Sequence, residues 1–267
     1  MTTRISLPPE HPGERQDGFL VATMAKDYPE NALVARHSHR RSQLVFASSG
    51  VMRITTDSGA WVVPPQRAVW LPPGIEHEIQ ASGILKMRTL YFEPGTEFEQ
   101  AFPTGCTVIE VSPLVREVIL RAVEVGSQED GKSSRLVRLM AVLLDEIKTL
   151  TVLSLHLPIP ADRRVARICE ALLADPSADL TLGGWSKIVG ASERTLARQF
   201  LSGTGMSFAQ WRQKARLLAG LVKIARGEPI LSVALDMGYS SPSAFSAMFR
   251  RILGAAPSAY FSKQRSI

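Results

Sequence analysis

The sequence predicts two domains, an N-terminal all-β jelly roll or sandwich with a helical connector and a C-terminal all-α domain. Six short apolar runs between residues 33 and 92 are separated by Gly and Pro, which is typical of the strands of a sandwich or jelly roll. A helical unit is written twice between residues 181 and 260. The proline-containing segment 156–160 lies between these regions and cannot continue a helix. A chain of 267 residues can build two cores of ordinary size, although a single domain stays possible.

The N-terminal domain is expected over residues 1–155, with strands over about 18–110 and helices over about 113–150. The expected strands are 44–46, 51–55, 61–63, 68–71, 78–80 and 86–92, and Gly50 is expected to close the strand that carries His37, His39 and Gln43. The second helix carries an apolar stripe suited to pairing across a two-fold axis, formed by Leu136, Met140, Leu143 and Ile147. Residues 156–161 are expected to be a linker with few contacts, and residues 162–267 the C-terminal domain.

The two copies of the duplicated unit agree at positions where the packing of the helices restricts the residue type. In each copy an apolar helical segment reaches a small residue and then, four positions later, a Gly that can take the positive φ of a sharp turn. A second helical segment follows, so each copy predicts a helix-turn-helix. The matching pairs are Leu182 and Ile230, Trp185 and Val233, Ser186 and Ala234, Gly190 and Gly238, Leu196 and Phe245, Phe200 and Phe249, Gly205 and Gly254, and Trp211 and Tyr260.

In the first copy the second helix is expected to face DNA. Ser192 is its predicted N-cap, and Thr195 and Ala197 face outward together with Arg194 and Arg198. Arginine makes bidentate contacts with guanine in the major groove, so Arg194 and Arg198 are the predicted base readers. The alternative is that both are solvated helix arginines.

The second copy is expected to hold DNA mainly through phosphates. Ser241 is the predicted N-cap, with Pro242 at the first helical position. The outward residues are short and mostly uncharged, and they are Ser243, Ala244, Ser246 and Ala247. Arg250 and Arg251 at the end of the helix are the predicted phosphate contacts. The helix that joins the copies spans about 19 residues, or roughly 28 Å, broadly compatible with successive major grooves about 34 Å apart.

Positive charge is concentrated in the duplicated half. Residues 162–267 hold 15 Lys and Arg against 7 Asp and Glu, whereas residues 1–161 hold 16 against 18. This asymmetry favours a polyanionic partner for the C-terminal half. An ordinarily basic helical domain is the alternative.

A second group of residues is expected to form a site in the strand region. His37, His39 and Gln43 would point to one face of a strand by the period of two, and a later turn brings in His77. The spacings H-x-H-x3-Q-x6-G and P-x-G-x2-H resemble the two motifs of the cupin superfamily, which implies a jelly-roll barrel holding a metal with three His and one Glu. Here Gln43 stands at the Glu position, and Asn31 stands where a glycine precedes the first motif. The open alternatives are a bound divalent metal, a metal-free effector cavity, or histidines that are only hydrogen-bonded.

The two halves together resemble the AraC/XylS family of bacterial transcription regulators. The ending of the second copy carries the resemblance, through Gly238, Tyr239, Phe245, Phe249, Arg250, Gly254, Pro257 and Tyr260. The resemblance implies a sequence-specific DNA-binding regulator, activator or repressor, that senses a small molecule through its N-terminal half. The expected partners are double-stranded DNA and an unidentified effector, with RNA polymerase and a second copy of the chain as further candidates.

Other function classes have less support. A cupin-type metalloenzyme with a helical appendage is the main alternative, and a nonspecific DNA binder is a third. Residues 126–133 match the phosphate-loop pattern, but they follow a helical pattern instead of a strand and carry Glu129 and Asp130 where phosphates would lie. The N-terminal residues lack a signal peptide's apolar run, so we expect a cytoplasmic protein that does not enter the membrane. We also consider Met52, Arg53, Trp61, Trp70 and Arg88 as candidates to line a cavity.

Overall fold

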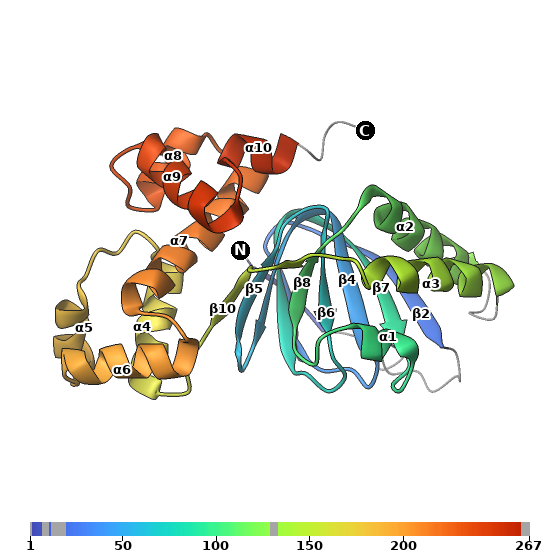
Figure 1. Cartoon of the computed structure of the whole chain (residues 1–267), viewed down its shortest axis with the longest axis horizontal. Helices are drawn as coiled ribbons and strands as arrows, with labels where there is room; N and C mark the ends of the chain where they lie inside the picture. The colour runs from blue at the N-terminus through green and yellow to red at the C-terminus, as the bar shows by residue number, and fades with distance from the viewer. Residues whose placement is uncertain (1, 7–10, 12–19, 129–132, 263–267) are drawn as a thin grey trace. The chain divides into compact units, whose positions relative to one another are not determined.

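The computed structural model describes residues 2–6, 11, 20–128 and 133–262 (Figure 1). It divides into two compact units. The first contains Met1–Thr56 and Trp61–Leu155, and the second contains Asp57–Ala60 and His156–Ile267. The first unit is rich in strands and the second is helical, so the expected fold class is confirmed.

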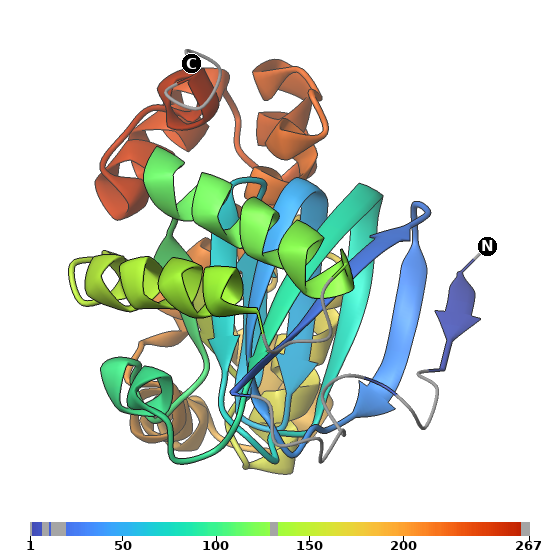
Figure 2. The same cartoon turned by 90° about the vertical axis from the view of Figure 1, so that its right-hand side faces the viewer.

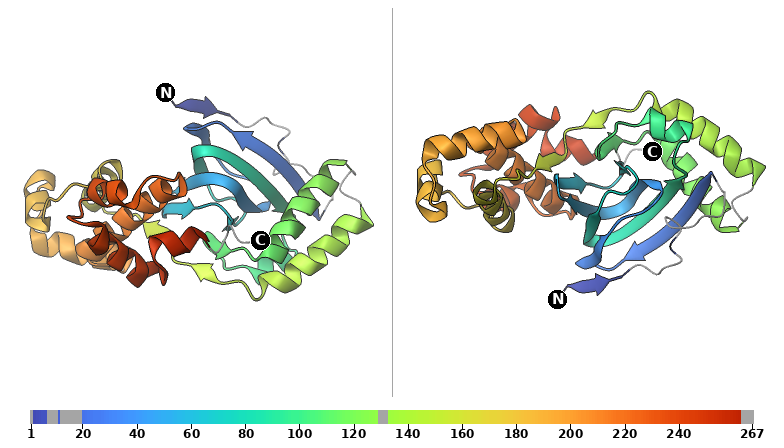
Figure 3. Two further views of the ribbon diagram at one scale, coloured as in Figure 1. Left: turned by 90° about the horizontal axis from the view of Figure 1, so that it is seen from above. Right: turned by 90° about the horizontal axis from the view of Figure 1, so that it is seen from below.

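The first unit is built on a sheet whose strands follow the order β1-β3-β7-β4-β6-β8-β9, while β2 pairs with β7 and β5 with β4. Seen from above and below, the strands curve into one layer that α2 and α3 flank (Figure 3). The strands are β1 (Thr3–Ile5), β2 (Val21–Tyr28), β3 (Ala32–His37), β4 (Ser42–Thr56), β5 (Gly59–Val63), β6 (Arg67–Leu71), β7 (His77–Phe92), β8 (Thr107–Glu110) and β9 (Val152–Leu153).

The two longest strands correct the sequence prediction. The expected strands 44–46 and 51–55 are parts of β4, and 78–80 and 86–92 are parts of β7. Gly50 does not close a strand. It takes a φ of 74° at an irregularity in the β4–β7 register, and a Cβ there would lie 2.6 Å from the carbonyl oxygen of Ile84. Glycine at this position therefore bends a continuous strand against its neighbour.

Two helices cover one face of this sheet, α2 (Pro113–Gln128) and α3 (Ser134–Ile147), as Figure 2 shows. A short helix, α1 (Glu97–Ala101), precedes β8. The α3 stripe of Leu136, Met140, Leu143 and Ile147 is buried in the same core as the side chains of α2 and the sheet. The prediction that this stripe pairs across a two-fold axis is therefore wrong, because its apolar face is already covered within the chain.

Part of the phosphate-loop match also has a defined structure. Gly126 and Ser127 lie in α2, which is a helix and not the buried strand that a phosphate loop follows. Residues 129–132, and with them Glu129 and Asp130, lie outside the described residues.

The expected linker forms a strand, β10 (His156–Pro158). Leu157 is fully buried, and the amide of Ile159 donates to the carbonyl of Ser58 at 3.3 Å. The indole Nε1 of Trp211 donates to the carbonyl of Pro158 at 2.7 Å. These contacts lie within the second unit, and the segment is extended because proline excludes a helix but is tolerated at a strand edge. A DNA-binding fragment that began at Asp162 would leave the buried Trp211 nitrogen without its acceptor.

The second unit consists of helices in the order that the duplication predicts. They are α4 (Arg163–Ala174), α5 (Leu182–Val189), α6 (Glu193–Thr204), α7 (Phe208–Ala225), α8 (Ile230–Asp236), α9 (Pro242–Leu253) and α10 (Pro257–Ser262). The turn glycines Gly190 and Gly238 have φ values of 67° and 73°, as expected. α7 is the joining helix, and its buried side chains include those of Phe208, Trp211, Ala215, Leu217, Leu218 and Leu221. Within the described part of the chain, no helix is long and apolar enough to cross a membrane.

Candidate DNA-binding surface and histidine cluster

The outer face of α6 presents two arginines. The Ser192 hydroxyl accepts a hydrogen bond from the Thr195 amide at 3.2 Å, so the predicted N-cap is confirmed. Arg194, Ala197 and Arg198 are exposed, whereas Thr195 is half-buried. Arg194 and Arg198 are four positions apart, so they lie on one helix face. Leu196 and Phe200 are fully buried on the opposite side and anchor the helix in the core of the unit.

The outer face of α9 presents short side chains and one arginine. Ser241 caps the helix by accepting from the Ala244 amide at 3.2 Å, with Pro242 at the first turn. Ser243, Ala244 and Ala247 are exposed and Ser246 is half-buried. Arg250 is exposed at the end of the helix. Arg251 instead donates to the side-chain oxygen of Gln213 on α7 at 2.6 Å, which draws its charge toward the joining helix.

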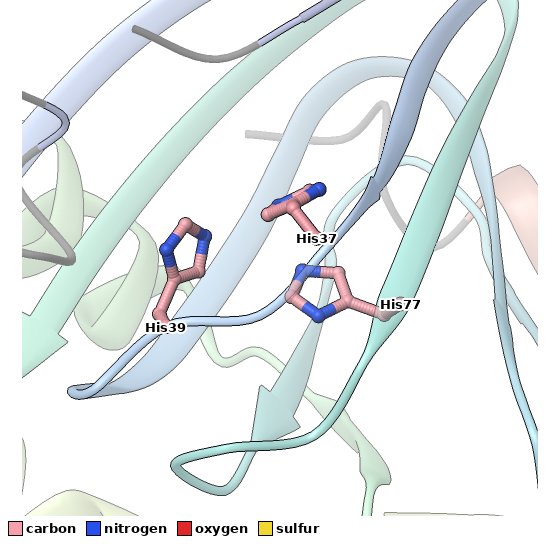
Figure 4. Close-up of side chains that lie close together, drawn as sticks. All are labelled: His37, His39 and His77. Atoms are coloured by element: carbon pink, nitrogen blue, oxygen red, sulfur yellow. The ribbon is translucent and has the colours of Figure 1, made fainter. Parts of the chain in front are cut away.

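Three histidines meet in the first unit (Figure 4). One ring nitrogen from each of His37, His39 and His77 lies within 4.8 Å of the other two. His37 ends β3 and faces His77 at the start of β7, whereas His39 follows β3 and Gln43 lies on β4. The prediction that His37, His39 and Gln43 share one strand is wrong, because the chain leaves β3 after His37. The predicted residues nevertheless converge, since the β3–β7 and β4–β7 pairings bring three segments together.

Hydrogen bonds to backbone carbonyls fix the tautomers of two of these rings. Nδ1 of His37 lies 2.6 Å from the carbonyl oxygen of Ala35, and Nδ1 of His77 lies 2.8 Å from that of Ile75. A carbonyl only accepts, so each Nδ1 carries the proton and each Nε2 presents a lone pair. Metal-binding histidines are commonly oriented in this way, by donating the second ring N–H to a carbonyl. The Gln43 amide nitrogen lies 3.3 Å from Nε2 of His77 and donates to it.

Burial and neighbouring charges lower the pKa values of two of these rings. Burial, followed by the charges of the neighbouring histidines, lowers the pKa of His39 to about 2. Burial and the nearby His37 lower the pKa of His77 to about 4. Neutral imidazole is the form that binds metal ions.

A small cavity opens beside the cluster. It is lined by His11, Met24, Tyr28, Val34, His37, His39, Gln43, Ile79, Met87 and Tyr91. The hydroxyl of Tyr28 is buried and has no hydrogen-bond partner among the described residues, which indicates room for a polar guest.

The sequence did not single out His11. Its ring stacks on His39, with centroids 4.6 Å apart, and its Nε2 lies 3.2 Å from the Tyr91 hydroxyl. No periodic pattern surrounds His11, and only the tertiary structure brings it to the cluster. None of the candidates Met52, Arg53, Trp61, Trp70 and Arg88 lines this cavity. Trp70, for example, stacks on Phe102 in the core at 4.0 Å, and Arg88 pairs with Asp27 at 2.8 Å.

Comparison with known proteins agrees with this arrangement. Residues 20–143 match the model of the AraC-like ligand-binding domain, and residues 185–263 match that of a helix-turn-helix domain. The chain is 35% identical over 232 residues to the HTH-type transcriptional regulator NimR of Escherichia coli, which covers 86% of this chain and 83% of NimR. The chain belongs to the AraC family of transcriptional regulators. It is a DNA-binding transcriptional regulator with an N-terminal ligand-binding domain.

Two further similarities are more limited. The HTH-type transcriptional regulator RipA of Corynebacterium glutamicum is 36% identical over 107 residues, which is 40% of this chain and 32% of RipA. The crystal structure of fatty-acid-bound ToxT from Vibrio cholerae covers 92% of this chain and 96% of ToxT, with 13% identity and a TM-score of 0.37.

The histidine site of this AraC-family regulator suits a metal ion in its donor chemistry. Three imidazoles converge, and two of them, those of His37 and His77, are oriented by a hydrogen bond from Nδ1 to a backbone carbonyl. Asn31, which stands in the glycine position of the cupin motif, has a φ of 61°, a conformation that asparagine tolerates better than most residues. This departure from the motif therefore preserves the turn before β3. The other departure, Gln43, places a neutral amide beside His77 where cupins carry a carboxylate.

A buried arginine of this AraC-family regulator was not singled out from the sequence. Arg216 lies on α7 and is 8% exposed. Its Nε donates to the carbonyl of Pro176 at 2.8 Å, and its Nη2 donates to those of Ser177 and Ala178 at 3.2 Å each. Its guanidinium also lies 5.9 Å from the ring centre of Tyr239, in the turn before α9. Arg216 therefore ties the loop before the first helix-turn-helix to the turn of the second. The only sequence signal was a charged residue next to the apolar stripe of the joining helix.

Proposed function

We propose that this regulator reads bases mainly through α6 and grips the phosphate backbone through α9. The support is the difference between the two outer faces. α6 presents Arg194 and Arg198, whose guanidinium groups can make bidentate contacts with guanine, and Ser192, Thr195 and Ala197 lie beside them. α9 presents short side chains at Ser241, Ser243, Ser246 and Ala247, which bring the helix close to DNA but discriminate bases weakly. Arg250 and Arg251 supply positive charge at the end of α9.

Replacement of the arginines should separate these roles. An operator selected from random duplexes by the full-length protein serves as the specific DNA, and a scrambled duplex serves as the nonspecific DNA. Arg194→Ala or Arg198→Ala should cost about 1–3 kcal/mol on the operator and relax the preference at particular base pairs. Arg250→Ala should weaken binding to both duplexes similarly. It should also lower the slope of log affinity against log salt concentration by the amount expected for about one phosphate contact.

Arg167→Ala is the matched control, because Arg167 is exposed on α4 and its loss also removes one positive charge from the same unit. This variant should bind both duplexes nearly as the wild type does. An equal loss on operator and scrambled DNA for the Arg194, Arg198 and Arg250 variants would show that α6 does not read bases.

We further propose that His37, His39 and His77 hold a transition-metal ion, a divalent one in the simplest case, and that this ion is a ligand of the N-terminal domain. The converging neutral imidazoles and the small cavity support this proposal. The ion would fix the relative positions of β3, the loop after it and β7, because each contributes one ligand. Gln43 would serve as a hydrogen-bonding neighbour of His77.

Metal content tests this second proposal. Purified protein, or protein stripped with a chelator and reloaded, should contain about one equivalent of metal by elemental analysis. His77→Ala should lose it, and His156→Ala should retain it, because His156 lies on β10 and outside the cluster. A wild-type protein that takes up no metal on reloading would leave the histidines with a structural role or with an organic effector.

The cupin-type metalloenzyme is the second candidate, and the lining of the cavity argues against it. Among the described residues that line the cavity, none is a carboxylate, so the cavity offers no acidic side chain for acid–base catalysis. We therefore propose that the chain has no enzymatic activity of its own. We also propose that it works in the cytoplasm as a homodimer and contacts RNA polymerase as activator or repressor. The dimer would need a surface other than the buried α3 stripe. The mass of the protein in solution, with and without operator, measures the oligomeric state.

A further inference from the structure

We propose that the ion held by His37, His39 and His77 is copper, bound as Cu(I), and that a thioether sulfur of Met24 or Met87 completes its ligands. The inference rests on the proposed metal site and names the ion that this site selects. Three features of the described residues carry it, namely the absence of charged donors, the two methionines and the small size of the cavity.

The cavity wall is poor in the donors that hard cations need. Among the described residues that line it, none is a carboxylate, and the side-chain oxygens are those of Tyr28, Gln43 and Tyr91. Burial raises the pKa of Tyr28 to about 12, so its phenol stays protonated and neutral. Calcium, magnesium and manganese prefer carboxylate, carbonyl and water oxygens. A site of this composition therefore favours a late transition metal with nitrogen and sulfur ligands.

The two methionines come from paired strands and reach the same cavity. Met24 lies on β2 and Met87 on β7, and the register pairs Met24 with Thr89 and Lys26 with Met87. Side chains two positions apart on a strand point to the same face, so Met24 and Met87 lie diagonally across one face of the β2–β7 pair. Both methionines line the same small cavity as His37 and His39.

Sulfur distinguishes copper from its competitors at this site. Thioether ligands select Cu(I), whereas Zn(II) takes thiolate, imidazole and carboxylate ligands. Three imidazoles alone would accept zinc, nickel or copper, so the methionines decide the preference. A monovalent ion also leaves less uncompensated charge in a cavity without carboxylates.

The affinities of the full-length protein for Cu(I) and Zn(II) test this assignment. Each ion is supplied to chelator-stripped protein from a competing chromophoric ligand. Cu(I) should bind at least about tenfold more tightly than Zn(II). The Met24→Leu/Met87→Leu double variant should lose about tenfold or more in Cu(I) affinity, while its Zn(II) affinity stays within about twofold. Leucine keeps the volume and apolar character of methionine but removes the sulfur, and thermal unfolding by circular dichroism checks the fold.

X-ray absorption at the copper edge gives a readout independent of affinity. Wild-type protein loaded with Cu(I) should show sulfur among the nearest scatterers, and the double variant should show nitrogen and oxygen only. Tighter binding of zinc, or an unchanged Cu(I) affinity in the double variant, overturns the copper assignment and leaves the metal site standing. If His77→Ala binds both ions as the wild type does, or if the wild type binds neither ion, the three-histidine site itself is wrong.

Discussion

Replacement of Arg216 by methionine should lower the free energy of unfolding of the DNA-binding unit by about 2–4 kcal/mol, because charged hydrogen bonds contribute about 1.5–3 kcal/mol each and are not additive. Methionine fills much of the same space but leaves the carbonyls of Pro176, Ser177 and Ala178 without their donor. Denaturant unfolding of the full-length protein, followed by the helical signal in far-UV circular dichroism, measures the change.

Arg212→Met is the matched control. Arg212 lies one turn earlier on α7, pairs with the exposed Asp179 at 3.4 Å and donates to the carbonyl of Leu180 at 3.1 Å. Its side chain is 22% exposed, against 10% for Arg216, so its loss should cost less, about 1 kcal/mol or below. Equal losses for the two variants would mean that Arg216 is not a specific tie within the unit.

The same variant should also affect DNA binding. Arg216 connects the loop that leads into α5 with the turn that leads into α9, and so it helps to hold the two helix-turn-helix units in one arrangement. Arg216→Met should therefore weaken binding to an operator with both recognition sites more than binding to a duplex that carries only the part read by α6. A uniform loss on both duplexes would assign the effect to stability alone.

Alanine at Gly238 should destabilise the protein more than alanine at the equivalent Gly190. A non-glycine residue in the left-handed region costs about 1–2 kcal/mol, and both glycines lie in it. At Gly190 a Cβ meets nothing within 4 Å, so the backbone cost should be the whole effect. At Gly238 a Cβ would lie 3.1 Å from Nη2 of Arg216 and 3.1 Å from the carbonyl oxygen of Ser177.

The expected total is therefore about 1–2 kcal/mol for Gly190→Ala and about 2–4 kcal/mol for Gly238→Ala, where the hydrogen bonds of Arg216 are disturbed as well. Equilibrium unfolding of the two variants measures the difference. In the Arg216→Met background the excess at Gly238 should shrink, since the crowded guanidinium is gone. An excess that persists in that background would point to the Ser177 carbonyl, and not to Arg216, as its cause.

The local sequence was sufficient for much of the fold. The helix-turn-helix units, the caps Ser192 and Ser241, and the left-handed glycines Gly190 and Gly238 all follow from short-range chemistry. A cap needs only an acceptor side chain at the right position, and a turn needs a residue that tolerates positive φ. The spacing of the histidines likewise predicted that His37, His39 and His77 would meet, because the turn directly before His77 brings this residue back to the other two.

Contacts between distant segments decided the rest. β4 and β7 run on through Gly50 and Gly83 because each pairs with the other along its length, which no local pattern reports. The α3 stripe could have faced a second chain, and only packing assigned it to the core of its own unit. His11 stacks on His39 across a separation of 28 residues, and Arg216 donates to the loop at 176–178 across about 40. Met24 and Met87, which lie on paired strands, are 63 residues apart. The sequence by itself determined which elements form and which face of each is apolar, since those depend on neighbours three or four residues away. Only the tertiary structure decided which polar and sulfur-bearing side chains share a cavity, because burial and pairing between strands depend on the whole chain at once.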